Sequence, residues 1–144
     1  MPQPLWIVVA NGSRARVFQR TRHDEPLTEV KDWVHPGTRQ HQQVQGNGHR
    51  QSGIRGRSAL AERSLPQDRE RAVFAGEICA WLVHALHTHQ VSRIALLSSN
   101  PFLGELMAHG QGALHPHLCA THAVDLTSLP AAQLEERLRE TYRL

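Results

Sequence analysis

Three segments near the N-terminus have the residue pattern of β-strands, and we expect them to form an antiparallel meander. Leu5–Ala10 is apolar at every position, which is typical of a central strand covered on both faces. Arg14–Arg20 alternates between two faces, and a third strand is expected over Leu27–His35. Asn11-Gly12 lies between the first two segments and predicts a type I′ hairpin turn, because both residues tolerate positive φ.

Two helices and a strand are expected in the middle of the chain. Helical spacing predicts a helix over about 66–89, preceded by a capping box at 64–67. Its apolar residues are Phe74, Ile78, Trp81, Leu82 and Ala85. Residues 91–99 are nearly all apolar and predict a short strand, after which Asn100-Pro101 is expected to cap a second helix. The apolar side of that helix holds Phe102, Leu103, Leu106 and Met107.

A fifth strand over 117–124 and a C-terminal amphipathic helix complete the pattern. Thr127 or Ser128 is expected to cap this helix. Its inward side is formed by Leu134, Leu138 and Tyr142. Strand–helix–strand units imply parallel pairing with right-handed crossovers, so the meander should continue into a mixed five-stranded sheet with helices packed on it. The order βββ–loop–αβαβα predicts an α/β fold of the ribonuclease-H-like type, in a single domain over residues 1–144.

Residues 36–64 differ from the rest because they contain Gly, Gln and Arg but almost no large apolar side chain. No acidic residue lies between Asp32 and Glu62, whereas four arginines do: Arg39, Arg50, Arg55 and Arg57. We expect a long, flexible, basic loop, and loops of this length are usually functional or disordered. Arginines without acidic neighbours suit the phosphates of a nucleic-acid backbone. No aromatic residue is present for base stacking, and a solvated surface loop is the alternative interpretation.

Charge and cysteine content favour a soluble cytoplasmic protein. The 144 residues carry a formal charge of +3 with eleven histidines uncounted, which permits contact with acidic surfaces but does not require it. Cys79 and Cys119 stand alone and are expected to be reduced and buried. The N-terminal segment lacks a basic n-region, and no stretch approaches the roughly 20 apolar residues of a membrane span. An exposed edge strand would offer a route to a homodimer.

The sequence does not predict an enzyme active site. Ribonuclease-H-type catalysis needs carboxylates at strand ends to hold two divalent ions, but the first strand ends in Asn11 and the fourth in Ser-Ser-Asn. The G-x-S-x-G nucleophile elbow is absent. His84 and His87 have the spacing to share one ion, but a third ligand is not evident and solvated histidines are the favoured interpretation. We therefore assign no catalytic residue, metal or cofactor, and lean toward a protein that is not an enzyme.

Two groups of residues are candidates for binding anions. Ser98, Ser99 and Asn100 follow a strand and precede a helix, and a helix N-terminus beside a parallel strand can form an anion pocket. Capping and turn formation are the alternative explanation of these three residues. Arg14 and Arg16 share one face of the second strand, and we expect them to extend the basic surface of the loop toward nucleic acid.

Three segments resemble the bacterial host attachment protein family, also described as protein required for attachment to host cells. They read WIVVANGSRARVFQ, SNPFLGELM and VDLTSLPAAQLEERL, and they follow in order over nearly the whole chain. The first and last are fairly specific, whereas the middle one is shared in style with many α/β proteins. The family is similar to the central domain of archaeo-eukaryotic release factors and of the ribosome-rescue protein Pelota. This kinship also implies a ribonuclease-H-like fold.

The resemblance implies a link to translation but does not extend to peptidyl-tRNA hydrolysis. Release factors have a Gly-Gly-Gln tripeptide between the third strand and the long helix, where this chain reads GNGHRQ over residues 46–51. We expect a non-enzymatic protein that binds RNA or the ribosome electrostatically, with a loop that orders on contact. The alternatives are a hydrolase acting on RNA or peptidyl-tRNA, and a host-facing adhesin or adaptor.

Overall fold

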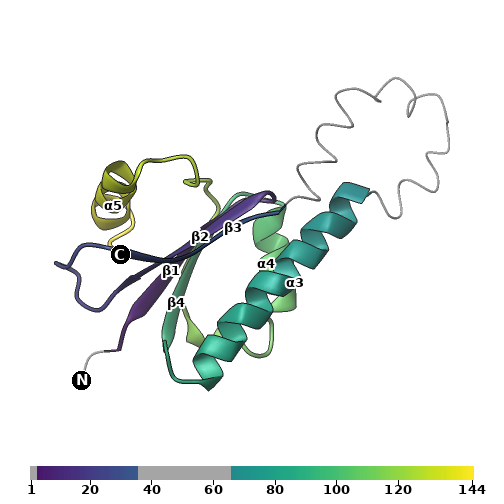
Figure 1. The fold of residues 1–144 in the computed structure, drawn as a ribbon, viewed down its shortest axis with the longest axis horizontal. Helices are drawn as coiled ribbons and strands as arrows, with labels where there is room; N and C mark the ends of the chain where they lie inside the picture. Colours follow the sequence, from purple (N-terminus) through teal and green to yellow (C-terminus); the bar gives the residue numbers. More distant parts are fainter. Residues whose placement is uncertain (1–2, 36–65) are drawn as a thin grey trace.

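The computed structural model describes residues 3–35 and 66–144, which form a five-stranded mixed sheet with helices on both faces (Figure 1). The strands are β1 Leu5–Ala10, β2 Arg14–Arg20, β3 Thr28–Val34, β4 Arg93–Ser98 and β5 Leu118–His122. The α-helices of the described residues are α3 Pro66–His87, α4 Phe102–His109 and α5 Ala131–Glu140. A short 3-10 helix, His115–His117, precedes β5 and is absent from the prediction.

The strand order is β3-β2-β1-β4-β5, which confirms the predicted meander and the mixed five-stranded sheet. β1 pairs antiparallel with β2, and β2 pairs antiparallel with β3. β1 also pairs parallel with β4, which pairs parallel with β5. All six side chains of β1 are buried, because helices cover both faces of this central strand.

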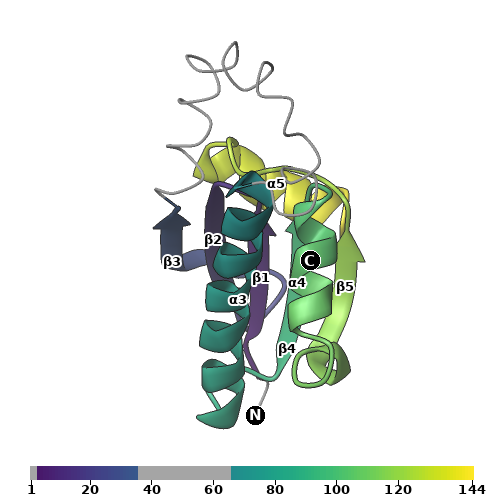
Figure 2. The same ribbon diagram turned by 90° about the vertical axis from the view of Figure 1, so that its right-hand side faces the viewer.

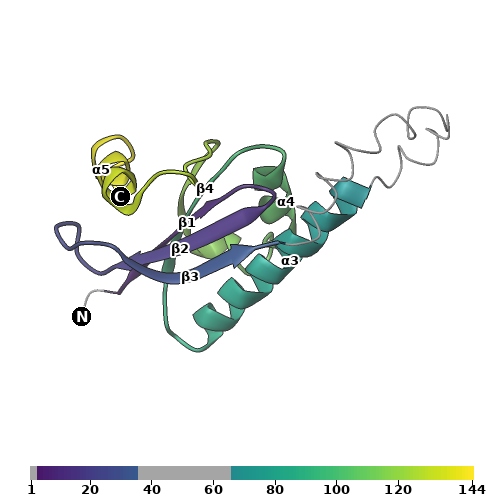
Figure 3. The same ribbon diagram turned by 45° about the horizontal axis from the view of Figure 1, so that its top comes forward.

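The helices form two unequal layers on the sheet. α3 and α4 lie on one face, and α5 lies on the other (Figures 2 and 3). The larger core lies under α3 and α4, where Phe74 and Leu82 of α3 belong to one buried cluster with Val8 of β1. The smaller core lies under α5, where Leu134 and Leu138 are fully buried against the opposite face of the sheet.

Three tryptophans join α3 to the sheet in the larger core. Trp81 of α3 stacks on Trp6 of β1 with ring centroids 5.0 Å apart, and meets Trp33 of β3 edge-on at 5.1 Å. Aromatic pairs in these geometries add to the free energy that burial provides. The periodicity of the sequence predicts Trp81 on the inward side of this helix, and the structure confirms it.

Helix boundaries differ from the prediction where local geometry decides them. α3 ends at His87 rather than His89, because His89 has a φ of 60° and cannot continue a right-handed helix. α4 has Pro101 of the predicted Asn100-Pro101 cap at its N-cap position, but no side chain caps the helix by a hydrogen bond. The first residues of the predicted capping box, 64 and 65, lie outside the described residues.

The N-terminal cap of α5 is also predicted wrongly. The helix begins at Ala131 after Pro130, without a side-chain cap, and not after Thr127 or Ser128. Thr127 is buried, and its hydroxyl donates to Asp125 Oδ1 at 2.7 Å. Because this hydroxyl already has a partner in the segment before the helix, it does not cap the helix.

Candidate anion-binding site

A pocket of about 270 Å³ opens where the carboxyl ends of β1 and β4 meet. Ala10 pairs with Ser98 in this parallel pair, so the chain leaves both strands at the same edge of the sheet. From β1 the sheet continues on one side with β2 and on the other with β4. Ligands of open α/β sheets bind outside the carboxyl ends of strands at such a position.

The pocket is lined by three segments that are far apart in the sequence. They are the β1–β2 turn, the first turns of α3 and the chain that enters α4. The lining residues are Asn11, Gly12, Ser13, Gln67, Arg71, Ser99, Pro101 and Phe102. Within this described set Arg71 carries a positive charge, no side chain is acidic, and the other polar side chains are those of Asn, Ser and Gln. The composition suits an anion better than a cation.

The β1–β2 turn is a hairpin, as predicted, but it is not of type I′. Asn11 does not have a positive φ. Its side chain instead accepts hydrogen bonds through Oδ1 from the backbone N–H groups of Ser13, at 2.8 Å, and Arg14, at 2.9 Å. An Asn side chain can close a turn on its own backbone in this way. The side chain therefore holds the turn that forms one wall of the pocket.

The amide nitrogen of Asn11 anchors the segment that leads from β5 to α5. It donates to Asp125 Oδ2 at 3.0 Å and to Thr127 Oγ1 at 3.1 Å. Burial would raise the pKa of Asp125, but the hydrogen bonds from Asn11 and Thr127 outweigh it and hold the pKa below its usual value. Asp125 is thus an ionised carboxylate with both oxygens engaged, which makes it part of the scaffold behind the turn.

Arg71 lies against the turn from the side of α3. A Cβ atom at Gly12 would come within 3.3 Å of Arg71 Cδ, so the glycine allows this close approach. The guanidinium forms an ion pair with Asp68 through Nη2. Its buried Nε has no hydrogen-bond partner among the described residues. Arg71 therefore combines a fixed position with hydrogen-bonding capacity that these contacts do not use.

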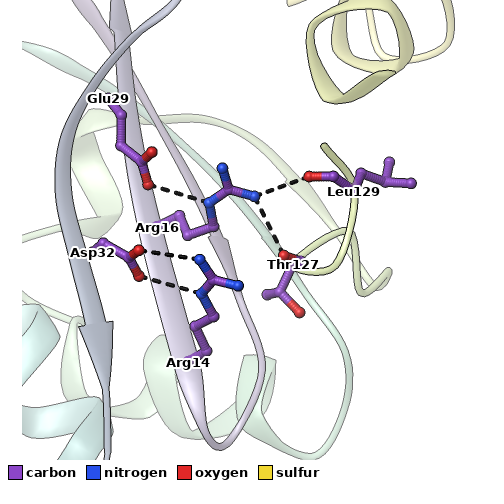
Figure 4. A network of polar contacts seen from close by, with 6 residues as sticks. All are labelled: Arg14, Arg16, Glu29, Asp32, Thr127 and Leu129. Atoms are coloured by element: carbon purple, nitrogen blue, oxygen red, sulfur yellow. Dashed lines mark hydrogen bonds and ion pairs between the residues drawn. The ribbon is translucent and has the colours of Figure 1, made fainter. Parts of the chain in front are cut away.

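Arg14 and Arg16, both predicted to contact nucleic acid, face two carboxylates of β3 (Figure 4). Arg14 forms a two-pronged contact with Asp32, at 3.2 Å from Nε and 3.1 Å from Nη2. The hydrogen bond to Asp32 raises the pKa of Arg14. Both side chains of this pair are well exposed to solvent. Arg14 can therefore exchange its partner for another anion at low cost.

Arg16 is 8% exposed and has several partners (Figure 4). Its Nε donates to Glu29 at 3.2 Å, and its Nη1 donates to the carbonyl oxygens of Thr127, at 3.3 Å, and Leu129, at 3.0 Å. The guanidinium also lies 4.9 Å from the ring centroid of Phe18. These contacts join β2 to β3 and to the segment before α5. Binding of nucleic acid by Arg14 and Arg16 stays a prediction.

The structure places one of the three predicted anion-binding residues of the β4–α4 segment in the pocket. Ser99 lines it, whereas Ser98 is fully buried and its hydroxyl donates to Ser99 O at 3.1 Å. Asn100 is exposed and is not a lining residue. The four loop arginines, Arg39, Arg50, Arg55 and Arg57, lie outside the described residues. Their predicted contacts with phosphate stay predictions.

Sequence reasoning missed Gln67 and Arg71, which lie one helical turn apart in α3. Their spacing of four residues places them on one side of the helix, and this spacing was available in the sequence. The apolar residues at helical spacing identified the helix but did not show what its N-terminal turns would face. The tertiary structure was needed to show that these turns pack beside the β1–β2 turn, where Gln67 and Arg71 line the pocket.

The histidines considered as metal ligands, His84 and His87, do not line this pocket. His84, His87 and His109 line a second pocket of about 420 Å³ between α3 and α4. The ring of His117 lies 3.1 Å from the carbonyl oxygen of Ser92. In the part of the chain that the structure describes, no three His, Cys, Asp or Glu side chains are grouped to hold a metal ion.

The fold and the pocket define an α/β protein with a polar cavity, lined by one arginine, at the carboxyl edge of a mixed sheet. The family model described as "Protein required for attachment to host cells" matches residues 6–138, and the chain belongs to that family. A comparison with curated proteins returned no match. None of the described helices is long and apolar enough to cross a membrane.

Proposed function

We propose that this host attachment family protein binds RNA or the ribosome through phosphate groups and does so without catalysing a reaction. The observation that carries the proposal is the Arg71 pocket, which has a guanidinium and several polar side chains and no acidic side chain among its lining residues. A phosphate oxygen accepts hydrogen bonds from guanidinium, amide and hydroxyl groups alike. The pocket would hold one phosphate, and other basic residues would hold the neighbouring ones.

The arrangement of the Arg71 side chain supports this proposal. Its aliphatic part lies against Gly12, and Asp68 holds the guanidinium from one side. A guanidinium fixed in this way loses less conformational entropy when it binds a phosphate than a freely moving side chain does. The pair with Asp68 lowers the local charge, so a single pocket would bind weakly. Contacts to several phosphates of a polymer would then be needed for useful affinity.

As part of the same proposal, the element order favours a ribonuclease-H-like fold, and the resemblance to the host attachment family implies kinship with the central domain of release factors and Pelota. This kinship would place the protein at the translation apparatus and in the cytoplasm. Further phosphate contacts would come from the loop arginines, Arg39, Arg50, Arg55 and Arg57. In the sequence they precede α3, which begins at Pro66 and carries Arg71. Hydrolysis is not proposed, because both oxygens of Asp125 accept hydrogen bonds from Asn11 and Thr127.

Binding of a labelled single-stranded RNA, followed by fluorescence anisotropy, tests the proposal. Arg71→Ala should weaken binding about tenfold and lower the salt slope by about one charge. Arg69→Ala is the matched control, because Arg69 is exposed on the same helix and does not line the pocket. Equal affinity of the two variants, with unchanged melting temperatures, would rule out the pocket as the phosphate site.

Salt dependence and cell fractionation test the wider proposal. Raising salt from roughly 50 to 200 mM should reduce RNA affinity strongly, because phosphate contacts release counterions. Sedimentation of a cell lysate should show the protein together with ribosomal particles at low salt. Affinity that does not change with salt would contradict the electrostatic mechanism. Recovery of the protein outside the cell, away from a cytosolic marker, would favour the adhesin alternative instead.

A further inference from the structure

The two edges of the sheet differ in how they are protected from pairing with another strand. β3 carries Glu29, Lys31 and Asp32 within seven residues. β5 forms the opposite edge and reads LCATH, without a formally charged residue or a proline. Proteins commonly protect exposed edges with charged side chains, especially Lys, or with proline. By charge and proline content, β5 is the less protected edge of the described sheet.

A groove of about 260 Å³ lies beside β5 and is formed together with α4 and the short 3-10 helix. Its lining residues are Met107, His115, Leu118, Cys119, Ala120 and Thr121. An open strand edge next to a groove for side chains is the arrangement used in recognition by strand addition. Backbone groups of the edge can pair with a new strand, and the groove can take side chains from it.

Cys119 lies where the pairing between β4 and β5 is irregular. The pairing register shifts between Ile94 and Ala95, which leaves Cys119 without a partner residue in β4. Cys119 is exposed, so the prediction that both cysteines are buried is wrong for this one. The register is regular from Ala120 to His122, where Ala120 and His122 face the core under α5 and Thr121 faces the side of α4. These three residues offer a regular pairing edge.

We propose that a second copy of this chain pairs antiparallel with β5, with a two-fold axis at Thr121. In this register Thr121 lies opposite Thr121 of the partner subunit, and Ala120 lies opposite His122 of the partner subunit. An antiparallel pair around a two-fold axis brings residues of one face together, and opposing Thr side chains are favourable cross-strand neighbours. No pair of formally charged residues is opposed, so the strand is complementary to itself.

The two-fold arrangement joins the sheets of the two copies into one continuous sheet. Because the axis is perpendicular to the sheet, the α4 helices of both copies lie on the same side, and the two grooves beside β5 become adjacent. A strand of five residues provides few hydrogen bonds, so the dimer is weak, with a Kd on the order of 10 µM.

Sedimentation velocity over a range of concentrations tests the pairing. The wild type should show a concentration-dependent dimer, and Thr121→Lys should stay monomeric, because two like charges would oppose each other across the axis. Val30→Lys is the matched control, since Val30 is exposed on the other edge, and it should dimerise like the wild type. A wild type that is monomeric up to about 1 mM, or a Thr121→Lys variant that dimerises normally, would overturn the proposal.

Cross-linking tests the register. Thr121→Cys in a Cys119→Ser background should form a disulfide-linked dimer under mild oxidation, because cysteines directly opposite on antiparallel strands meet the distance requirement. Burial raises the pKa of the remaining Cys79 to about 11, so that thiol should stay reduced. Val30→Cys in the same background is the control. Equal cross-linking of the β5 and β3 cysteine variants would overturn the pairing through β5. A disulfide from Thr121→Cys to a different protein, in place of the homodimer, would also overturn it.

Discussion

The two faces of the sheet are covered in physically different ways. On the face of α3 and α4, apolar and aromatic side chains form a continuous core that includes Phe74 and Phe102, with ring centroids 5.4 Å apart. On the face of α5, two leucines of that helix are fully buried. The segment that leads into α5 is held by polar contacts from Arg16 and Asn11.

The difference shows how a short helix that buries only two of its own side chains can be positioned with the help of polar contacts to the segment before it. Full burial of Leu134 and Leu138 contributes about 1.5–3 kcal/mol each. Hydrogen bonds from Arg16 fix two carbonyl groups of the segment before the helix begins. The α5 face should therefore depend on ionisation and hydrogen bonding as well as on its smaller core, whereas the α3 face should depend mainly on packing.

The largest effect should come from a cavity on the α3 face. Phe74→Ala should lower the free energy of unfolding by about 3–5 kcal/mol, because Phe74 is 1% exposed between Phe102 and His35. Urea denaturation measures this loss. Val73→Ala is the control on the same helix, and its effect should stay within about 0.5 kcal/mol because Val73 is 53% exposed. Similar losses in both variants would contradict the packing account of this face.

A smaller effect should separate the two arginines of β2. Arg16→Ala should cost about 2–3 kcal/mol, because it removes the donor to two carbonyls and leaves Glu29 without its partner. Arg14→Ala should cost less than about 1 kcal/mol, because its pair with Asp32 is exposed. Urea denaturation of both variants under the same conditions provides the comparison. Equal costs would show that Arg16 does not hold the α5 segment.

The same contrast between packing and polar contacts explains what the sequence could predict. The bounds of β1 and β2 agree with the prediction to the residue, because an apolar run, an Asn-Gly turn and an alternating run are all local features. β4 and β5 are shorter than predicted, since apolar residues such as Val91 and Val124 continue beyond the paired part of each strand.

The candidate site was less predictable because its contacts join distant parts of the chain. Asn11 and Asp125 are 114 positions apart, and no periodicity relates them. The wrong cap assigned to Thr127 has the same cause. A hydroxyl group shortly before a helix can cap the helix, but the Thr127 hydroxyl instead accepts a hydrogen bond from Asn11, which is far away in the sequence. Ser99 was a candidate because a helix N-terminus beside the end of a parallel strand can form an anion pocket, and it lines the pocket, whereas Arg71 required the packing of α3.

The smallest effect should appear as a dependence of stability on pH on the α5 face. Hydrogen bonds from Asn11 and Thr127 hold the pKa of Asp125 below its usual value in the folded protein. The stabilisation is therefore fully present above the unfolded pKa of about 3.9 and is lost as pH falls through the lower folded value. Urea denaturation between about pH 5 and pH 3 should show a smaller decrease in stability for Asp125→Asn than for the wild type.

Asp24→Asn is the control for this pH dependence, because Asp24 is exposed in the turn between β2 and β3, whereas the carboxylate that Asn11 and Thr127 contact is that of Asp125. Its stability should decrease with pH as the wild type does. If Asp125→Asn and Asp24→Asn gave the same profile, the carboxylate of Asp125 would not stabilise the α5 segment. A flatter profile for Asp125→Asn alone would show that the Asp125 carboxylate stabilises the contact between the β1–β2 turn and the segment that leads into α5.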